Sequence, residues 1–132
     1  MRQAYRNTKT TVSFINYHFV FCPRYRRKVL VDQVEIQFKQ IVTEICAEQD
    51  WQLLAMEVMP DHVHIFLSAL PTDSPAELMA KLKGITSRRL REQFKHLNHL
   101  QSLWTRSYLV STAGNFSSET IKRYVEGQKT RG

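Results

Sequence analysis

The sequence predicts an α+β fold: a four-stranded antiparallel sheet in the ferredoxin-like or RRM-like β-α-β-β-α-β order, with one added C-terminal helix. Stretches rich in β-branched and aromatic residues alternate in this order with stretches of helical apolar spacing. Prolines and capping patterns separate these stretches. The 132 residues, 42% hydrophobic and 23% charged, fit one globular domain, residues 1–132, in which we expect residues 1–10 to be flexible.

The first two elements follow from composition and spacing. Residues 13–22 are aromatic and β-branched, so they predict a strand, and Pro23 ends it. Apolar residues at helical spacing then predict a helix that runs to about residue 49. Asp32, with Glu35 three positions later, predicts the N-cap and capping box of that helix.

The middle of the chain predicts a hairpin and a second helix. Residues 51–59 and 62–70 have strand composition, and Pro60-Asp61 between them predicts a tight turn that pairs the two strands. Ser74-Pro75-Ala76-Glu77 then combines an N-cap, a proline at N1 and a glutamate at N3. A helix therefore begins there, and apolar spacing continues it to about residue 94.

The last third predicts one more strand and the added helix. Residues 103–112 have strand composition, and Gly114-Asn115 predicts a turn after them. Either Ser117 or Ser118 can cap a final helix over residues 119–129. The sequence shows no internal repeat and no linker, which supports a single domain.

Two histidines lie two positions apart on the predicted strand 62–70. Because strand side chains alternate between faces, His62, His64 and Phe66 share one face and the apolar residues between them share the other. Two imidazoles on one rigid face form half of a divalent-metal site. Ordinary polar residues on a half-exposed strand are the plainer interpretation. For His18, a place near the metal site and a structural role both stay open. Asp61 adjoins the first histidine and could tune the site, but a turn residue is the simpler interpretation.

The charge balance indicates a polyanionic partner. Nineteen Lys and Arg against twelve Asp and Glu give a net charge of +7, and nucleic acid is the most common partner of such a chain. A solvated, solubilising surface is the alternative. The basic residues cluster in segments 24–28, 81–95 and 122–131.

We expect a cytoplasmic protein with no membrane segment. No apolar run approaches the length of a membrane span, and the N-terminus lacks an apolar signal region. Cys22 and Cys46 form no C-x-x-C pattern, so two buried, reduced thiols are expected.

The predicted last helix carries a second candidate pair. Tyr124 and Gln128 are four residues apart and therefore lie on one helical face. Ile121 and Val125 flank that face, so core packing is the plainer interpretation. Gly127 costs helix stability, which argues against a purely structural role for this helix, unless the glycine lies near the C-cap.

Together these motifs resemble a known family. His62-Val63-His64, residues 17–26, Trp104-Thr105-Arg106-Ser107-Tyr108 and the Tyr124–Gln128 spacing occur in the order found in the single-tyrosine HUH transposases of the 200/605-type insertion sequences. HUH stands for histidine, hydrophobic residue, histidine. The similarity extends from about residue 13 to residue 129.

The resemblance implies a mechanism. His62, His64 and Gln128 would bind a divalent metal, Mg²⁺ or Mn²⁺, and Tyr124 would be the nucleophile that attacks a DNA phosphodiester. The products would be a 5′-phosphotyrosine and a free 3′-OH, followed by strand transfer. The implied partners are single-stranded DNA with hairpin ends and a second copy of the chain, in a homodimer that can share active sites between subunits. Whether Tyr124 acts in cis or in trans stays open.

The resemblance also places the protein in the prokaryotic cytoplasm, on the nucleoid during reaction. Two other functions stay open: a domesticated HUH transposase that acts on repeated genomic palindromes, and a non-catalytic RRM-like nucleic-acid-binding module. Basic side chains from the clusters above are the expected DNA contacts. They are Arg24, Arg26, Arg27, Lys28, Lys83, Arg88 and Lys129.

Overall fold

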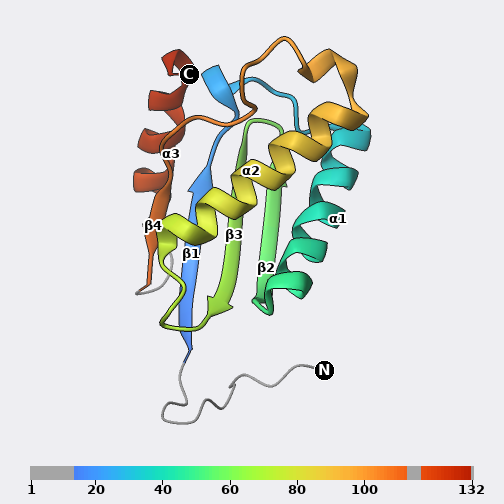
Figure 1. Ribbon diagram of the computed structural model, residues 1–132. Helices are drawn as coiled ribbons and strands as arrows, with labels where there is room; N and C mark the ends of the chain where they lie inside the picture. Colours follow the sequence, from blue (N-terminus) through green and yellow to red (C-terminus); the bar gives the residue numbers. More distant parts are fainter. Residues whose placement is uncertain (1–13, 113–116, 132) are drawn as a thin grey trace.

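The computed structural model of the chain describes residues 14–112 and 117–131 (Figure 1). The sequence predictions for residues 1–10, for the first residue of the strand 13–22, and for the turn at Gly114-Asn115 lie outside the described residues.

Within the described residues the chain forms a four-stranded sheet in the order β2-β3-β1-β4. Each neighbouring pair of strands is antiparallel, which confirms the predicted sheet. Tight pairing of β2 with β3 across Pro60-Asp61 confirms the predicted hairpin. The strands are β1 (Ile15–Phe21), β2 (Gln52–Met59), β3 (His62–Ala69) and β4 (Leu109–Ser111).

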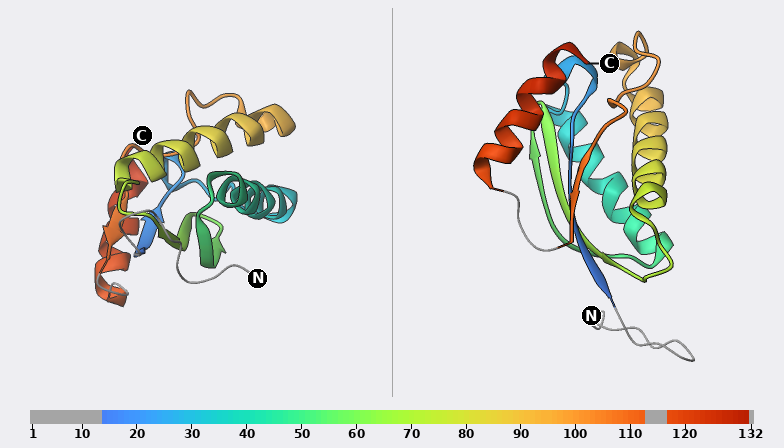
Figure 2. Two further views of the ribbon diagram at one scale, coloured as in Figure 1. Left: turned by 60° about the horizontal axis from the view of Figure 1, so that its bottom comes forward. Right: turned by 90° about the vertical axis from the view of Figure 1, so that its left-hand side faces the viewer.

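Helices cover both faces of the sheet. The helices α1 (Asp32–Gln49) and α2 (Pro75–Gln93) lie on one face, and α3 (Ser118–Gly127) lies on the other (Figure 2). The predicted capping box is present at the start of α2, where Ser74 and Glu77 bond each other's backbone N–H groups. In the described part of the chain, short 3₁₀ helices follow β1, α2 and α3: Arg24–Arg26, Lys95–Leu97 and Gln128–Thr130.

The hydrophobic core lies between the sheet and the α1/α2 layer. The side chains that β3 sends to this layer, Val63, Ile65 and Leu67, are completely buried, as the alternation predicts. Both cysteines are free and buried, and burial raises the pKa of Cys22 to about 12 and that of Cys46 to about 11. None of the helices in the described residues is long and apolar enough to cross a membrane.

The predicted N-cap of α1 is wrong. The N-cap residue is Val31, and no side-chain cap hydrogen bond is formed. Asp32 has a left-handed φ of 52°, and the Val31 carbonyl accepts hydrogen bonds from the backbone N–H groups of Val34 and Glu35. A backbone carbonyl therefore satisfies the orphan donors that Asp32 was expected to satisfy.

The predicted strand 103–112 is mostly wrong, because only Leu109–Ser111 joins the sheet. Trp104 forms an isolated bridge with Pro23. Its indole is buried and donates to the Thr86 hydroxyl of α2 at 2.9 Å. The bulky, β-favouring residues at the start of this stretch therefore fill the space beneath α2 instead of extending β4.

Lys83 of α2 holds the next part of that stretch in place. Its ammonium donates to the backbone carbonyls of Thr105 at 2.8 Å and Ser107 at 2.9 Å, so these carbonyls are not available to a strand ladder. Burial lowers the pKa of Lys83 to about 8, and the nearby Cys22 acts in the opposite direction. Burying the Lys83 ammonium therefore costs free energy, and its two hydrogen bonds to backbone carbonyls offset that cost.

This arrangement predicts a pH-dependent stability. Between the folded pKa of about 8 and the unfolded value of 10.5, the unfolded chain holds more protons at Lys83, so the free energy of unfolding rises with pH. From pH 8 to 9 the rise is about 1 kcal/mol. Lys83→Met should lack this rise in urea titrations at the two pH values. An equal rise in the variant would contradict the assignment.

Candidate catalytic site

The imidazoles of His62 and His64 lie on the sheet face that α3 covers. They alternate along β3 with fully buried core residues, so the pleat fixes which way both rings point. Both side chains are half-buried, with ring centroids 5.2 Å apart. The predicted shared face is therefore confirmed for this pair.

His62 is oriented by the turn residue before it. The Nδ1 atom of His62 lies 2.9 Å from Oδ1 of Asp61, and Arg26 Nε donates to the other carboxylate oxygen at 2.7 Å. Burial alone would raise the pKa of Asp61, but hydrogen bonds from His62 and Arg26 outweigh burial and lower it. A carboxylate can only accept here, so Nδ1 of His62 carries a proton, and Nε2 is the ring nitrogen left for a ligand. Asp61 therefore does more than form a turn.

His64 is oriented by a histidine of the neighbouring strand. Nδ1 of His64 lies 3.2 Å from Nε2 of His18, whose ring stacks on Phe66 with centroids 4.0 Å apart. Desolvation is the largest cause that lowers the pKa of His18 and of His64, so both rings are neutral near pH 7. This leaves Nε2 of His64 available as a second nitrogen ligand.

The imidazole pair fits a divalent metal. Metal-binding histidines typically use one ring nitrogen for the ion and donate the other N–H to a carboxylate or similar partner. His62 and His64 both have a partner at Nδ1. Among the described residues no group of three or more His, Cys, Asp or Glu side chains could hold an ion. Any further protein ligand must therefore come from another residue type.

Tyr124 and Gln128 meet at one serine. The Ser107 hydroxyl donates to Oε1 of Gln128 at 3.0 Å and lies 3.1 Å from the Tyr124 hydroxyl. Since Ser107 gives its proton to Gln128, Tyr124 donates to Ser107. Burial raises the pKa of Tyr124, and its hydrogen bond with Ser107 partly opposes this. The predicted common face of Tyr124 and Gln128 is confirmed.

The structure does not join the two halves of the predicted site. A cavity of about 360 Å³ beside His62 and His64 is lined by Arg26 and by four α3 residues, which do not include Tyr124. Those four are Ile121, Lys122, Val125 and Glu126. Within the part of the chain that the structure describes, no hydrogen bond connects the imidazoles with Tyr124 or Gln128. The Tyr124 hydroxyl therefore contacts Ser107, and Tyr124 does not line this cavity.

The basic residues expected to contact DNA lie in different environments. Arg26 belongs to the histidine cavity, and the ammonium of Lys83 is turned toward backbone carbonyls. The 3₁₀ turn that contains Arg24 lies against the C-terminal turn, where Tyr25 N donates to the Arg131 carbonyl. The side chains of the remaining four residues are exposed: Arg27, Lys28, Arg88 and Lys129.

Sequence reasoning missed the contact made by Ser107 and left two other roles undecided. Ser107 was part of the motif at residues 104–108 but had no assigned contact, and for His18 and Asp61 a role at the site stayed open beside a structural one. Only the distances connect them to the site, because each partner comes from another element. The spacing of Asp61 directly before His62 was the one available signal.

Comparisons with known proteins point to one family. The family model described as "Transposase IS200 like" matches residues 11–128. The chain is 35% identical over 117 residues to the ISDra2 transposase TnpA of Deinococcus radiodurans, covering 86% of this chain and 84% of that protein. It is 32% identical over 115 residues to the transposase for insertion sequence element IS200 of Salmonella typhimurium, covering 85% and 75%.

Solved structures give the same result for the fold. A crystal structure of a Deinococcus radiodurans protein described as a transposase superposes with a TM-score of 0.84 at 35% identity, covering 93% of this chain and 97% of that one. A REP-associated tyrosine transposase bound to a REP hairpin superposes with a TM-score of 0.52 at 16% identity, covering 96% and 67%. The second match supports the fold alone.

Proposed function

The chain belongs to the IS200-like transposase family, and from this we propose that it moves a small insertion sequence by cutting and rejoining single-stranded DNA through Tyr124. Its relatives are named transposases, so the chain is an enzyme of DNA transposition. The mechanism proposed here rests on one observation. Two imidazoles, both held through Nδ1, share a sheet face with α3, which carries Tyr124 and ends directly before Gln128.

In this proposal His62, His64 and the amide oxygen of Gln128 hold Mg²⁺ or Mn²⁺. When bound, such an ion polarises the scissile phosphodiester and stabilises charge on the leaving oxygen. Tyr124 attacks the phosphorus, so the bond from Oη to phosphorus forms while the bond from phosphorus to O3′ breaks. The phenol loses its proton and O3′ gains one. The resulting 5′-phosphotyrosine conserves the bond, so a later 3′-OH can reverse the step.

The proposal requires Tyr124 and Gln128 to leave Ser107. Both side chains are bonded to Ser107, and neither Tyr124 of α3 nor Gln128 of the turn after it lines the histidine cavity. Either α3 rotates over the sheet, or Tyr124 serves the histidines of a second copy. Because the chain has one candidate nucleophile and an element has two ends, we propose a homodimer, with cis or trans action of Tyr124 as the two alternatives.

Hairpin ends of single-stranded DNA are the proposed substrate. The basic charge of this chain supports a nucleic-acid ligand, and the hairpin ends follow from the family resemblance. The REP-associated transposase, which shares the fold, was solved with a REP hairpin. A domesticated enzyme that acts on genomic palindromes would use the same chemistry on another target. The non-catalytic RRM-like module is less favoured, because the relatives are named transposases and α3 lies over part of the sheet face on which such a module stacks bases.

A denaturing gel tests the proposal directly. The purified chain is incubated with Mn²⁺ and labelled single-stranded DNA that carries the flanks of its own gene. We expect a slow covalent protein–DNA band with the single strand and none with the matching duplex. Equal reaction with duplex DNA would reject the single-strand substrate, and binding to both strands without any covalent band would reject the tyrosine mechanism.

A further inference from the structure

We propose that Arg26 is a catalytic residue, which binds a non-bridging oxygen of the scissile phosphate and stabilises the charge that this oxygen carries in the transition state. Arg26 lines the cavity of about 360 Å³ beside His62 and His64. Its side chain is 29% exposed, so it is partly withdrawn from water but open to a ligand in that cavity. The proposal rests on the proposed function, because it assigns a further residue to the same tyrosine reaction.

One carboxylate fixes the position of Arg26 relative to the histidines. Nε of Arg26 donates to Oδ2 of Asp61 at 2.7 Å, and Oδ1 of the same carboxylate accepts from Nδ1 of His62 at 2.9 Å. The two oxygens of one planar group therefore hold the guanidinium and the imidazole side by side. A ligand that reaches Nε2 of His62 meets Arg26 in the same cavity.

The guanidinium keeps donors for a ligand. An arginine presents N–H groups at Nε and at both Nη atoms, and Asp61 accepts only from Nε. Within the residues that the structure describes, no hydrogen bond or ion pair engages the Nη atoms of Arg26. The planar fork of these donors matches the oxygens of a phosphate group. The charge and the geometry of Arg26 therefore fit a phosphodiester.

The turn that carries Arg26 has an uncommon backbone. Tyr25 has a φ of 57° and Arg26 a φ of 52°, in the left-handed region that residues other than glycine rarely adopt. Such strain persists only where the surroundings impose it. Here the backbone N–H of Tyr25 donates to the Arg131 carbonyl at 2.6 Å, and that of Arg26 donates to the Pro23 carbonyl at 2.9 Å. Tyr25 and Arg27 are exposed, so this turn directs only the cation between them into the cavity.

Lys122 is the other cation of the cavity, and it fits the role less well. It belongs to α3, as does Glu126 one turn later, and both side chains are exposed. The proposed function requires α3 to rotate or to serve a second copy, so Lys122 moves with the nucleophile. Arg26 is bonded to the turn of the β-hairpin and stays with the histidines in either case.

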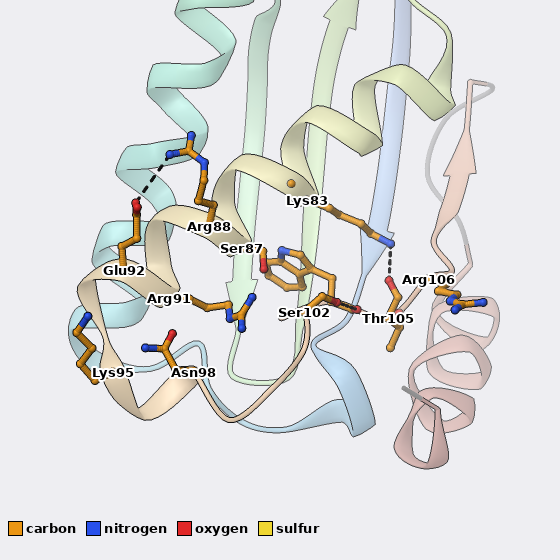
Figure 3. A pocket seen from close by; sticks show the side chains of 12 residues that line it. Lys83, Ser87, Arg88, Arg91, Glu92, Lys95, Asn98, Ser102, Thr105 and Arg106 are labelled. Atoms are coloured by element: carbon orange, nitrogen blue, oxygen red, sulfur yellow. Dashed lines mark hydrogen bonds and ion pairs between the residues drawn. The ribbon is translucent and has the colours of Figure 1, made fainter.

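The cations of the larger cavity are too remote for this role. That cavity, of about 600 Å³, lies between α2 and the connection 98–106, where Arg88 and Arg91 project from the helix (Figure 3). In the part of the chain that the structure describes, no residue lines both cavities. Among the described residues, Arg26 is therefore the only arginine placed to act on a phosphate at the histidines.

Arg26 acts on charge and transfers no proton. As the bond from Oη of Tyr124 to phosphorus forms and the bond from phosphorus to O3′ breaks, negative charge lies on the non-bridging oxygens. Donors that are already aimed at this charge stabilise the transition state more than the ground state. Arg26 keeps its own protons, so the proton balance of the tyrosine step is unchanged.

A charge-neutral phosphate tests the contact. Arg26→Gln should slow adduct formation by at least about 100-fold at saturating DNA and Mn²⁺. Arg89→Gln should react at the wild-type rate, because Arg89 is 30% exposed like Arg26 but pairs with Glu44 at 2.8 Å, away from the cavity. A methylphosphonate at the scissile position replaces one charged oxygen with a methyl group. On at least one of its stereoisomers the wild type and Arg26→Gln should react at nearly equal rates. An undiminished difference on both isomers would overturn the proposal.

A purely structural role for Arg26 has a different signature. If Arg26 only held Asp61, its loss would act through His62 and would weaken metal binding. Calorimetric titration with Mn²⁺ alone should instead give Arg26→Gln an affinity within about tenfold of the wild type, less than the loss of a direct partner of a ligand can cause. Recovery of the adduct rate by raising Mn²⁺ would assign Arg26 to positioning and overturn the catalytic role.

A binding scan separates this proposal from the tyrosine chemistry. A single methylphosphonate is moved along the strand, and the affinity of Tyr124→Phe, which forms no adduct, is measured with and without Arg26→Gln. At one linkage, the one that the wild type cleaves, Arg26 should give about tenfold tighter binding of the phosphodiester. If that linkage exists but the wild type forms no adduct, the tyrosine mechanism is rejected and Arg26 keeps its phosphate contact. No such linkage, or one away from the cleavage position, would overturn the role of Arg26.

Discussion

Tyr124→Phe is expected to abolish the covalent adduct with single-stranded DNA while leaving DNA binding largely unchanged. The phenyl ring keeps the shape of the side chain but lacks the only atom that can form the bond to phosphorus. Loss of a covalent nucleophile should lower the rate of adduct formation by at least about 10⁴-fold. Quantifying the shifted band on a denaturing gel over time measures the rate.

Folding should survive this substitution. Tyr124 is half-buried, and Ser107 still donates to Gln128 after the phenol is gone. The lost hydrogen bond costs about 1 kcal/mol of stability. Tyr17→Phe is a matched control, because it removes a phenol hydroxyl whose contact with the Asp73 carbonyl is a long 3.5 Å. An adduct that forms in Tyr124→Phe but not in Tyr17→Phe would show that the nucleophile assignment is wrong.

The β-hairpin and its two histidines could be predicted because their signal is local. Alternation with period two, bounded by Pro60-Asp61, specifies both the pairing and the face of each side chain. The start of α2 could be predicted for the same reason, since Ser74 and Glu77 are three residues apart and form the reciprocal hydrogen bonds of a capping box. In these segments the local preference and the tertiary packing agree.

Predictions from local sequence were wrong for the strand 103–112 and for the N-cap of α1. Residues 103–112 have strand composition, but Trp104 fills the space beneath α2, and Lys83 occupies the carbonyls of Thr105 and Ser107. At α1, the left-handed backbone of Asp32 left capping to the Val31 carbonyl. Neither outcome is visible in spacing: the first depends on partners in α2, and the second on a left-handed backbone conformation at Asp32.

The candidate site divides in the same way. Helical spacing correctly placed Tyr124 and Gln128 on one face, and their shared contact with Ser107 confirms it. Spacing could not show which surface that face meets. The orientation of a helix packed on an open sheet depends on its neighbours, including any second copy of the chain. The metal ligation of Gln128 therefore stays a prediction.

His64→Ala should weaken the binding of the divalent metal and abolish the metal-dependent formation of the covalent adduct. His64 contributes one of two nitrogen ligands, so its loss leaves His62 alone and should weaken Mn²⁺ binding by at least about 100-fold. Calorimetric titration with Mn²⁺ alone measures the affinity, and the gel assay measures the adduct. His96→Ala is the control, because His96 is exposed in the connection after α2. A normal adduct yield in the presence of a strong chelator would contradict the metal role.

A graded series distinguishes a metal centre from a polar patch on the sheet. Asp61→Asn keeps the shape of the side chain but weakens its hold on Nδ1 of His62, which lies 2.9 Å from the carboxylate. Loss of such an outer partner typically costs 10–100-fold in metal affinity by order of magnitude, less than loss of a ligand. The Mn²⁺ affinity should therefore fall in the order wild type, Asp61→Asn, His64→Ala. If the imidazoles are only polar surface groups, both substitutions will change the thermal unfolding midpoint. In that case adding Mn²⁺ will not raise the midpoint of the wild type or of either variant.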